Sequence, residues 1–171
     1  MTAPVVVTTS SAGATREVAA AVAALCVPGD VLLLSGDLGA GKTTFAQGFG
    51  RAVGVLEPVT SPTFTLIRQY EVPVGPTGVR TLFHADVYRL EHLGEIADLG
   101  LGQLVEDGGV ALVEWGDAAD PVLGAGALTL LLVADSDDGS RRTIRATSAG
   151  SSWEDRWDAL EATLDPWTLA S

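Results

Sequence analysis

A glycine-rich segment at residues 36–43 carries the most specific chemical signal in the sequence. It contains Gly36 and Gly41, followed by Lys42 and Thr43. This spacing is typical of a P-loop, in which backbone N–H groups surround a phosphate and the helix that follows points the positive end of its dipole at the same charge. The lysine reaches the β- and γ-phosphates, and the threonine hydroxyl binds Mg²⁺. We therefore expect this segment to bind ATP with Mg²⁺.

The residues expected to contact the nucleotide lie in this loop and directly after it. They are Asp37, Leu38, Gly39, Ala40, Gly41, Lys42, Thr43 and Thr44. Lys42 is the only lysine of the chain, because the other nine basic residues are arginines. The single lysine thus stands where a P-loop requires one, and it is a candidate catalytic residue.

Two acidic residues are candidates for the carboxylate that ATP hydrolysis needs. Such a carboxylate holds the metal or orients the attacking water, usually at the C-terminal end of a strand beside the P-loop. Glu114 follows directly after the apolar residues 110–113, and Asp86 lies within a predicted strand. Their positions make both candidate catalytic residues, although each also fits a solvent-facing acid.

Three further features near these acids have more than one interpretation. The hydroxyl-rich residues 60–65 could form a switch loop that senses a γ-phosphate, and they fit an ordinary turn equally well. His84 fits a hydrogen-bonded structural histidine better than a catalyst, and Arg89 fits a solvated strand-end residue better than a phosphate contact.

The elements that must position these residues follow from hydrophobic periodicity and from breaker residues. Strands are predicted at residues 5–8, 31–34, 63–70, 81–88 and 110–113, and helices at 15–25, 43–53, 93–99, 102–106 and 153–164. Apolar stretches at 127–134 and 141–147 flank a polar tip and predict an antiparallel hairpin. At 171 residues we expect one domain. The fold class is α/β, a single-domain P-loop NTPase-like fold with a mainly parallel central sheet flanked by helices and an antiparallel hairpin near the C-terminus.

The net charge of the chain argues against a protein that binds nucleic acid directly. The formal charge of −12 opposes direct binding to tRNA or DNA, since phosphate backbones are repelled.

The single cysteine, Cys26, excludes a disulfide within the chain, and its apolar surroundings predict a buried, unreactive thiol. No apolar run approaches the roughly 20 residues of a membrane span. The start of the chain also lacks the features of a signal peptide, so we expect a cytoplasmic location with no membrane partner.

Four blocks together resemble the bacterial TsaE (YjeE) family, the ATPase of tRNA threonylcarbamoyladenosine biosynthesis. They are residues 36–45, Ser-Pro-Thr-Phe-Thr-Leu at 61–66, His-Ala-Asp-Val-Tyr-Arg-Leu at 84–90 and Glu-Trp-Gly-Asp at 114–117. The resemblance implies a small α/β P-loop protein that hydrolyses ATP weakly alone. The resemblance further implies that it acts with the threonylcarbamoyl transferase subunit and its companion subunit, which modify the adenosine beside the anticodon in tRNAs that read ANN codons. Contact with tRNA would be indirect.

The resemblance also implies roles for individual residues. Thr43 and Glu114 would hold Mg²⁺, and Asp86 would serve hydrolysis. Further nucleotide contacts would come from Ala12, in the loop before the first helix, and from Arg141 in the late hairpin. The chain departs from the family pattern after Glu114-Trp115, so no role is given to Asp117.

Two other functions fit a P-loop protein of this length. A small-molecule kinase would need several arginines in a lid, and the three arginines at 141, 142 and 145 fall in one predicted hairpin. An ATP-binding assembly factor without hydrolysis would keep the P-loop alone. A regulatory GTPase would need an Asn-Lys-x-Asp block to read guanine. The only lysine of this chain is in the P-loop, so the chain has no such block and a regulatory GTPase is excluded.

Overall fold

The computed structural model describes residues 2–62, 67–73, 77–87, 94, 97, 100–114, 126–148 and 150–168. Its strands are β1 (Val5–Thr9), β2 (Val31–Ser35), β3 (Ile67–Glu71), β4 (Thr81–Asp86), β5 (Gly109–Glu114), β6 (Leu128–Ala134) and β7 (Arg142–Ser148). Its helices are α1 (Ala12–Ala23), α2 (Lys42–Val53), α4 (Leu101–Glu106), α6 (Ser151–Glu154), α7 (Trp157–Leu164) and the 3-10 turn η1 (Asp165–Trp167). In this part of the chain, no helix is both long and apolar enough to span a membrane.

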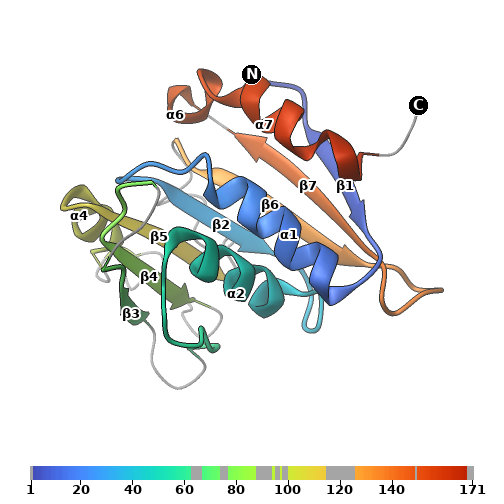
Figure 1. Ribbon diagram of the computed structural model, residues 1–171, viewed down its shortest axis with the longest axis horizontal. Coiled ribbons are helices and arrows are strands. Elements are labelled where there is room, and N and C mark those ends of the chain that lie inside the picture. The colour runs from blue at the N-terminus through green and yellow to red at the C-terminus, as the bar shows by residue number, and fades with distance from the viewer. Residues whose placement is uncertain are drawn as a thin grey trace.

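All seven strands form one sheet with the order β1-β7-β6-β2-β5-β4-β3 (Figure 1). The four central strands, β6, β2, β5 and β4, run parallel, which confirms the predicted parallel centre. The predicted hairpin is present as β6 and β7. The outer strands β3, β7 and β1 each pair antiparallel with their neighbour, so the sheet as a whole is mixed.

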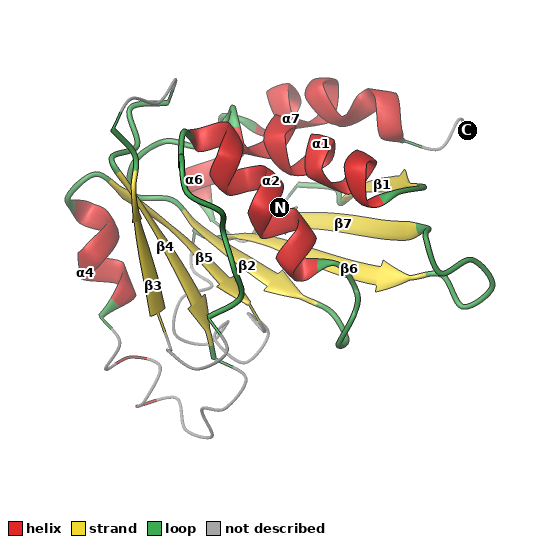
Figure 2. Ribbon diagram, turned by 60° about the horizontal axis from the view of Figure 1, so that its bottom comes forward, coloured by secondary structure: helices red, strands yellow, loops and turns green. Residues whose placement is uncertain are grey.

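Helices cover both faces of the sheet. Helices α1, α2 and α7 lie over one face, and α4 lies against the other face near β4 and β5 (Figure 2). Strand β2 shows how the sequence serves both layers. Its Leu32 and Leu34 pack under α1 and α2, while Leu33 packs in the cluster that contains α4, because successive side chains of a strand point to opposite faces.

The two helices beside the P-loop have clear boundaries. Helix α1 begins at Ala12, three residues before the predicted start, because the hydroxyl of Ser11 accepts a hydrogen bond from the backbone N–H of Ala14 at 3.0 Å. Helix α2 ends at Gly54, as predicted, with φ at 115°. Helices α1 and α2 pack closely because Gly48 has no Cβ, which would lie 2.6 Å from the backbone of Arg16.

The C-terminal segment differs from its prediction. The expected helix at 153–164 is two helices, α6 and α7, and Arg156 lies between them. The Arg156 guanidinium bonds both carboxylate oxygens of Asp30, at 2.7 and 2.9 Å, and this bonding raises the pKa of Arg156. Trp153 and Trp157 are buried in the core, as predicted. The ion pair between Arg156 and Asp30 thus connects the C-terminal helices to the turn before β2.

Several other predictions fall partly or wholly outside the described residues. The predicted strand at 63–70 is described from Ile67 onward, and the one at 81–88 ends at Asp86. Of the predicted helix at 93–99, only positions 94 and 97 are described, and both are helical. The predicted helix at 102–106 is α4.

Candidate functional site

The carboxyl ends of three adjacent parallel strands meet at one edge of the sheet. Strand β2 leads directly into the P-loop, and its Leu34 lies opposite Glu114 of β5. Glu114 in turn lies opposite Asp86 of β4. The fold therefore brings both candidate carboxylates and the P-loop to the same edge, which is where ligands bind in open α/β sheets.

The P-loop backbone requires glycine at particular positions. Gly36 has a φ of 144°, and a Cβ on it would collide with the carbonyl oxygen of Leu132. Gly39 and Gly41 also have positive φ values, of 81° and 103°. Within the loop, the N–H of Ala40 donates to the carbonyl of Asp37 at 3.0 Å. The motif glycines thus serve a sharp turn packed against β6.

Lys42 is folded back into the loop. It is 6% exposed, and its Nζ donates to the carbonyl oxygens of Gly36 at 2.6 Å and Asp37 at 3.1 Å. Asp37, Leu38 and Gly39 are exposed at the loop tip. The ammonium group is therefore held inside the turn that a phosphate would enter.

Thr43 and Glu114 are brought into contact. The Thr43 hydroxyl donates to Oε1 of Glu114 at 3.3 Å, and Glu114 is only 3% exposed. Its other oxygen, Oε2, lies 3.0 Å from Nε2 of His84, a residue with no exposed surface. A hydroxyl and a carboxylate are oxygen ligands of the kind that Mg²⁺ prefers, so this pair fits a magnesium site.

The structure also gives the positions of three other predicted site residues, Asp86, Thr44 and Ala12. Asp86 is the half-buried last residue of β4, and Thr44 is half-buried in the first turn of α2. Ala12 is exposed at the start of α1, which lies at the same end of the molecule as the start of α2 (Figure 1). Arg89, Asp117 and residues 63–65 of the predicted switch segment lie outside the described residues.

Arg142, which the sequence did not single out, contacts the P-loop directly. Its Nη2 donates to the carbonyl of Gly39 at 3.2 Å, and its Nη1 to the carbonyl of Gly139 at 2.5 Å. Arg141, the predicted contact, is exposed, and its backbone N–H closes the hairpin turn onto Asp138 at 3.1 Å. Strand alternation is the signal for this difference, since Arg142 shares a face of β7 with the buried Ile144.

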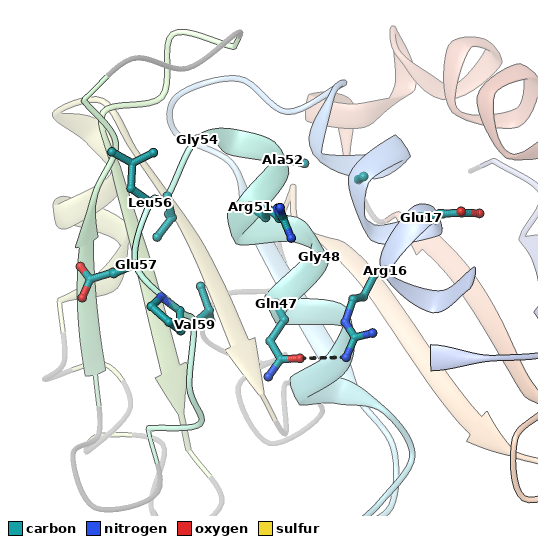
Figure 3. A pocket seen from close by; sticks show the side chains of 13 residues that line it. Arg16, Glu17, Gln47, Gly48, Arg51, Ala52, Gly54, Leu56, Glu57 and Val59 are labelled. Carbon is teal, nitrogen blue, oxygen red and sulfur yellow. Dashed lines mark hydrogen bonds between the residues drawn. The ribbon is translucent and has the colours of Figure 1, made fainter. Parts of the chain in front are cut away.

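A groove of about 860 Å³ lies away from the P-loop, between α1, α2 and residues 54–59 (Figure 3). The side chains of Arg16 and Gln47 join across it through a 3.4 Å hydrogen bond, and Leu56 at its border is 85% exposed. None of the predicted site residues lines it. Two hollows touch the P-loop at Gly36 and Asp37, one of about 410 Å³ that reaches Arg145 of β7 and one of about 170 Å³ beside β6. The expected phosphate site, the turn of residues 36–43, therefore lies apart from the 860 Å³ groove.

Cys26 is buried, as predicted. Burial, reinforced by the negative charge of Asp30, raises the pKa of its thiol well above the usual value. Because the thiolate is the reactive form, the thiol is unreactive near neutral pH.

Comparisons with known proteins agree over most of the chain. Residues 9–144 match the family model described as threonylcarbamoyl adenosine biosynthesis protein TsaE. The chain is 43% identical over 140 residues to the tRNA threonylcarbamoyladenosine biosynthesis protein TsaE of Bacillus subtilis. This alignment covers 82% of this chain and 83% of the Bacillus subtilis protein. It is 39% identical over 143 residues to the protein of that name from Streptomyces coelicolor, which covers 81% and 93%. The structure is similar to the crystal structure of Bacillus subtilis YdiB, with a TM-score of 0.75 and 35% identity over 97% of both chains.

Proposed function

The chain belongs to the TsaE family and so has a role in tRNA threonylcarbamoyladenosine biosynthesis, and on this premise we propose that its part in that process is to bind and hydrolyse ATP. One observation carries the proposal. The buried Glu114 carboxylate meets the Thr43 hydroxyl directly beside the P-loop lysine, at the edge where three parallel strands end. This arrangement unites the parts that phosphoryl transfer from a nucleotide requires.

The P-loop residues would bind the phosphates. Backbone N–H groups of the loop and of the first turn of α2 would donate to them, and the positive end of the helix dipole favours an anion there. Lys42 would exchange its bonds to the Gly36 and Asp37 carbonyls for bonds to phosphate oxygens. Because its Nζ is already positioned inside the turn, little reorganisation of the side chain is needed.

Thr43 and Glu114 would hold Mg²⁺, since their oxygen atoms fit this ion. Held by these two residues, the ion would supply neutralisation of the charge that develops on the β- and γ-phosphates. Asp86, at the end of the neighbouring strand, would orient the attacking water and accept its proton. Arg142 would hold the P-loop tip through Gly39, so that the backbone donors keep their direction.

Protein partners would connect this chemistry to tRNA. The charge of −12 opposes an RNA surface, and outside Lys42 the chain has only arginines as basic residues. We therefore propose that the threonylcarbamoyl transferase subunit and its companion supply the tRNA contact in the cytoplasm. Binding to them would raise ATP turnover by completing the site.

Reconstitution tests this function. The purified protein is mixed with candidate transferase and companion subunits, ATP, Mg²⁺ and tRNA, and both phosphate release and modified adenosine are measured. We expect slow hydrolysis by the chain alone, faster hydrolysis with the partners, and modified tRNA only in the complete mixture.

Two results would count against the proposal. Tight tRNA binding by the isolated chain in a mobility shift at near-physiological salt would contradict indirect contact. Modification that proceeds without any hydrolysis in a single turnover would indicate an ATP-binding assembly factor in place of an ATPase.

A further inference from the structure

His84 lies at the centre of the candidate site, although its sequence context indicated only a structural histidine. It is on β4, two residues before Asp86, and it is completely buried. Its Nε2 lies 3.0 Å from Oε2 of Glu114. Where the Glu114 carboxylate is ionised, as a metal ligand must be, it offers only acceptors, and Nε2 is then the donor of this bond.

The two ring nitrogens of His84 differ in their hydrogen bonding. Buried polar atoms normally find a partner, yet Nδ1 of His84 is buried and has none among the described residues. The hydrogen bond that the structure does give the ring goes to Glu114. The ring is thus held toward the candidate metal ligand.

The two oxygens of Glu114 have different partners. Oε2 accepts from His84 on β4, and Oε1 accepts from Thr43 at the start of α2. The histidine bond therefore occupies the oxygen that is not bonded to Thr43. Oε1 is left on the side of the P-loop, where a cation bound by Thr43 would lie.

We propose that His84 is a positioning residue that sets the orientation of the Glu114 carboxylate for Mg²⁺. This inference rests on the proposed function. Residues that hydrogen-bond a metal ligand orient it and increase its basicity, and their loss typically lowers metal affinity by about 10–100-fold. Without His84, the buried carboxylate would lose one of its two described partners and could rotate away from Thr43.

Two amide substitutions test the proposal, because they are equally polar and differ in reach. His84→Gln places an amide nitrogen near the position of Nε2 and can still donate to Glu114. His84→Asn places the amide nitrogen near the position of Nδ1, and the shorter side chain cannot donate to Glu114. His84→Leu fills the buried space without a donor, and it carries the same expectation as His84→Asn if the asparagine variant does not fold.

The readout is the Mg²⁺ concentration that gives half of the ATP-dependent thermal stabilisation of the full chain. We expect His84→Asn to raise this concentration about 10–100-fold. His84→Gln should stay close to wild type, and ATP binding in excess EDTA should be equal in all variants. In a Glu114→Gln background, His84→Asn should add little, since the residue acts through Glu114.

Each contrary result has a distinct meaning. A wild-type Mg²⁺ midpoint in His84→Asn or His84→Leu, or equal shifts in the asparagine and glutamine variants, would overturn the role of His84 and leave the proposed function intact. A wild-type protein that gains no stability from ATP and Mg²⁺ together would overturn the proposed function itself.

Discussion

The hydroxyl of Thr43 lies 3.3 Å from Oε1 of Glu114, although 71 residues separate them in the chain. The bond joins the first turn of α2 to the last residue of β5. It holds a P-loop hydroxyl and a strand-end carboxylate side by side. An ion bound by one of these two groups would therefore contact the other.

Lys42→Ala should abolish most ATP binding, because the lost ammonium group is the one positioned inside the phosphate turn. A wild-type protein at an ATP concentration about one hundred times its Kd gains roughly 2.7 kcal/mol of stability. The variant should gain almost none at that concentration, as measured by thermal unfolding. Arg51→Ala is a matched control, since it removes a positive charge from the same helix at the side of the groove. Equal stabilisation of Lys42→Ala and wild type would show that Lys42 does not bind nucleotide.

Glu114→Gln and Asp86→Asn should have different effects. We expect Glu114→Gln to raise the Mg²⁺ requirement by on the order of tenfold or more, because it removes a charged oxygen ligand. Asp86→Asn should leave ATP affinity nearly unchanged and reduce hydrolysis about 10²–10⁴-fold, the usual contribution of a general base. Mg²⁺ titration at fixed ATP, combined with single-turnover rates, separates the two.

Glu57→Gln controls for the loss of one acidic charge, since Glu57 is exposed and lines the distant groove. Wild-type curves from both site variants would mean that Glu114 and Asp86 take no part in the reaction. Identical defects in both would argue against the division of roles between metal binding and water orientation.

Arg142→Ala should weaken ATP binding severalfold, while Arg141→Ala should not. The Arg142 guanidinium holds the Gly39 carbonyl, and a charged donor typically strengthens such a bond. Arg141 offers a neighbouring arginine whose described hydrogen bonds come from its backbone. Equilibrium titration with a fluorescent ATP analogue measures both affinities. If Arg141→Ala had the larger effect, the nucleotide would contact the hairpin differently from our proposal.

Gly48→Ala should destabilise the protein by about 1–3 kcal/mol, because the new methyl group would be forced against the backbone of Arg16. Gly13→Ala is the matched helix variant. Its Cβ would meet only the Ser11 hydroxyl at 3.8 Å, and alanine is the better helix former by up to about 1 kcal/mol. Urea denaturation gives both free energies of unfolding. Equal stabilities of the two variants would contradict the close contact of α1 and α2.

Local patterns made much of this protein predictable. The P-loop residues, the end of α2 at Gly54 and the β6–β7 hairpin all depend on interactions within a few neighbouring residues. A glycine after a helical pattern predicts the end of the helix in any fold. A polar tip between two apolar stretches likewise predicts a hairpin. The same holds for the buried strands 31–34 and 110–113, whose apolar runs indicate burial on both faces.

The sequence by itself thus determined the phosphate-binding motif, the α/β class and the candidate acids, because each depends on residue type and short spacing. Only the tertiary structure decided that β2 lies between β5 and β6, that Glu114 meets Thr43 and His84, and that Arg142 contacts the P-loop at Gly39. These contacts join segments that are distant in sequence, and a shift of one residue in strand register would turn each side chain to the opposite face. Register is set by the packing of the whole core, so no local pattern contains it.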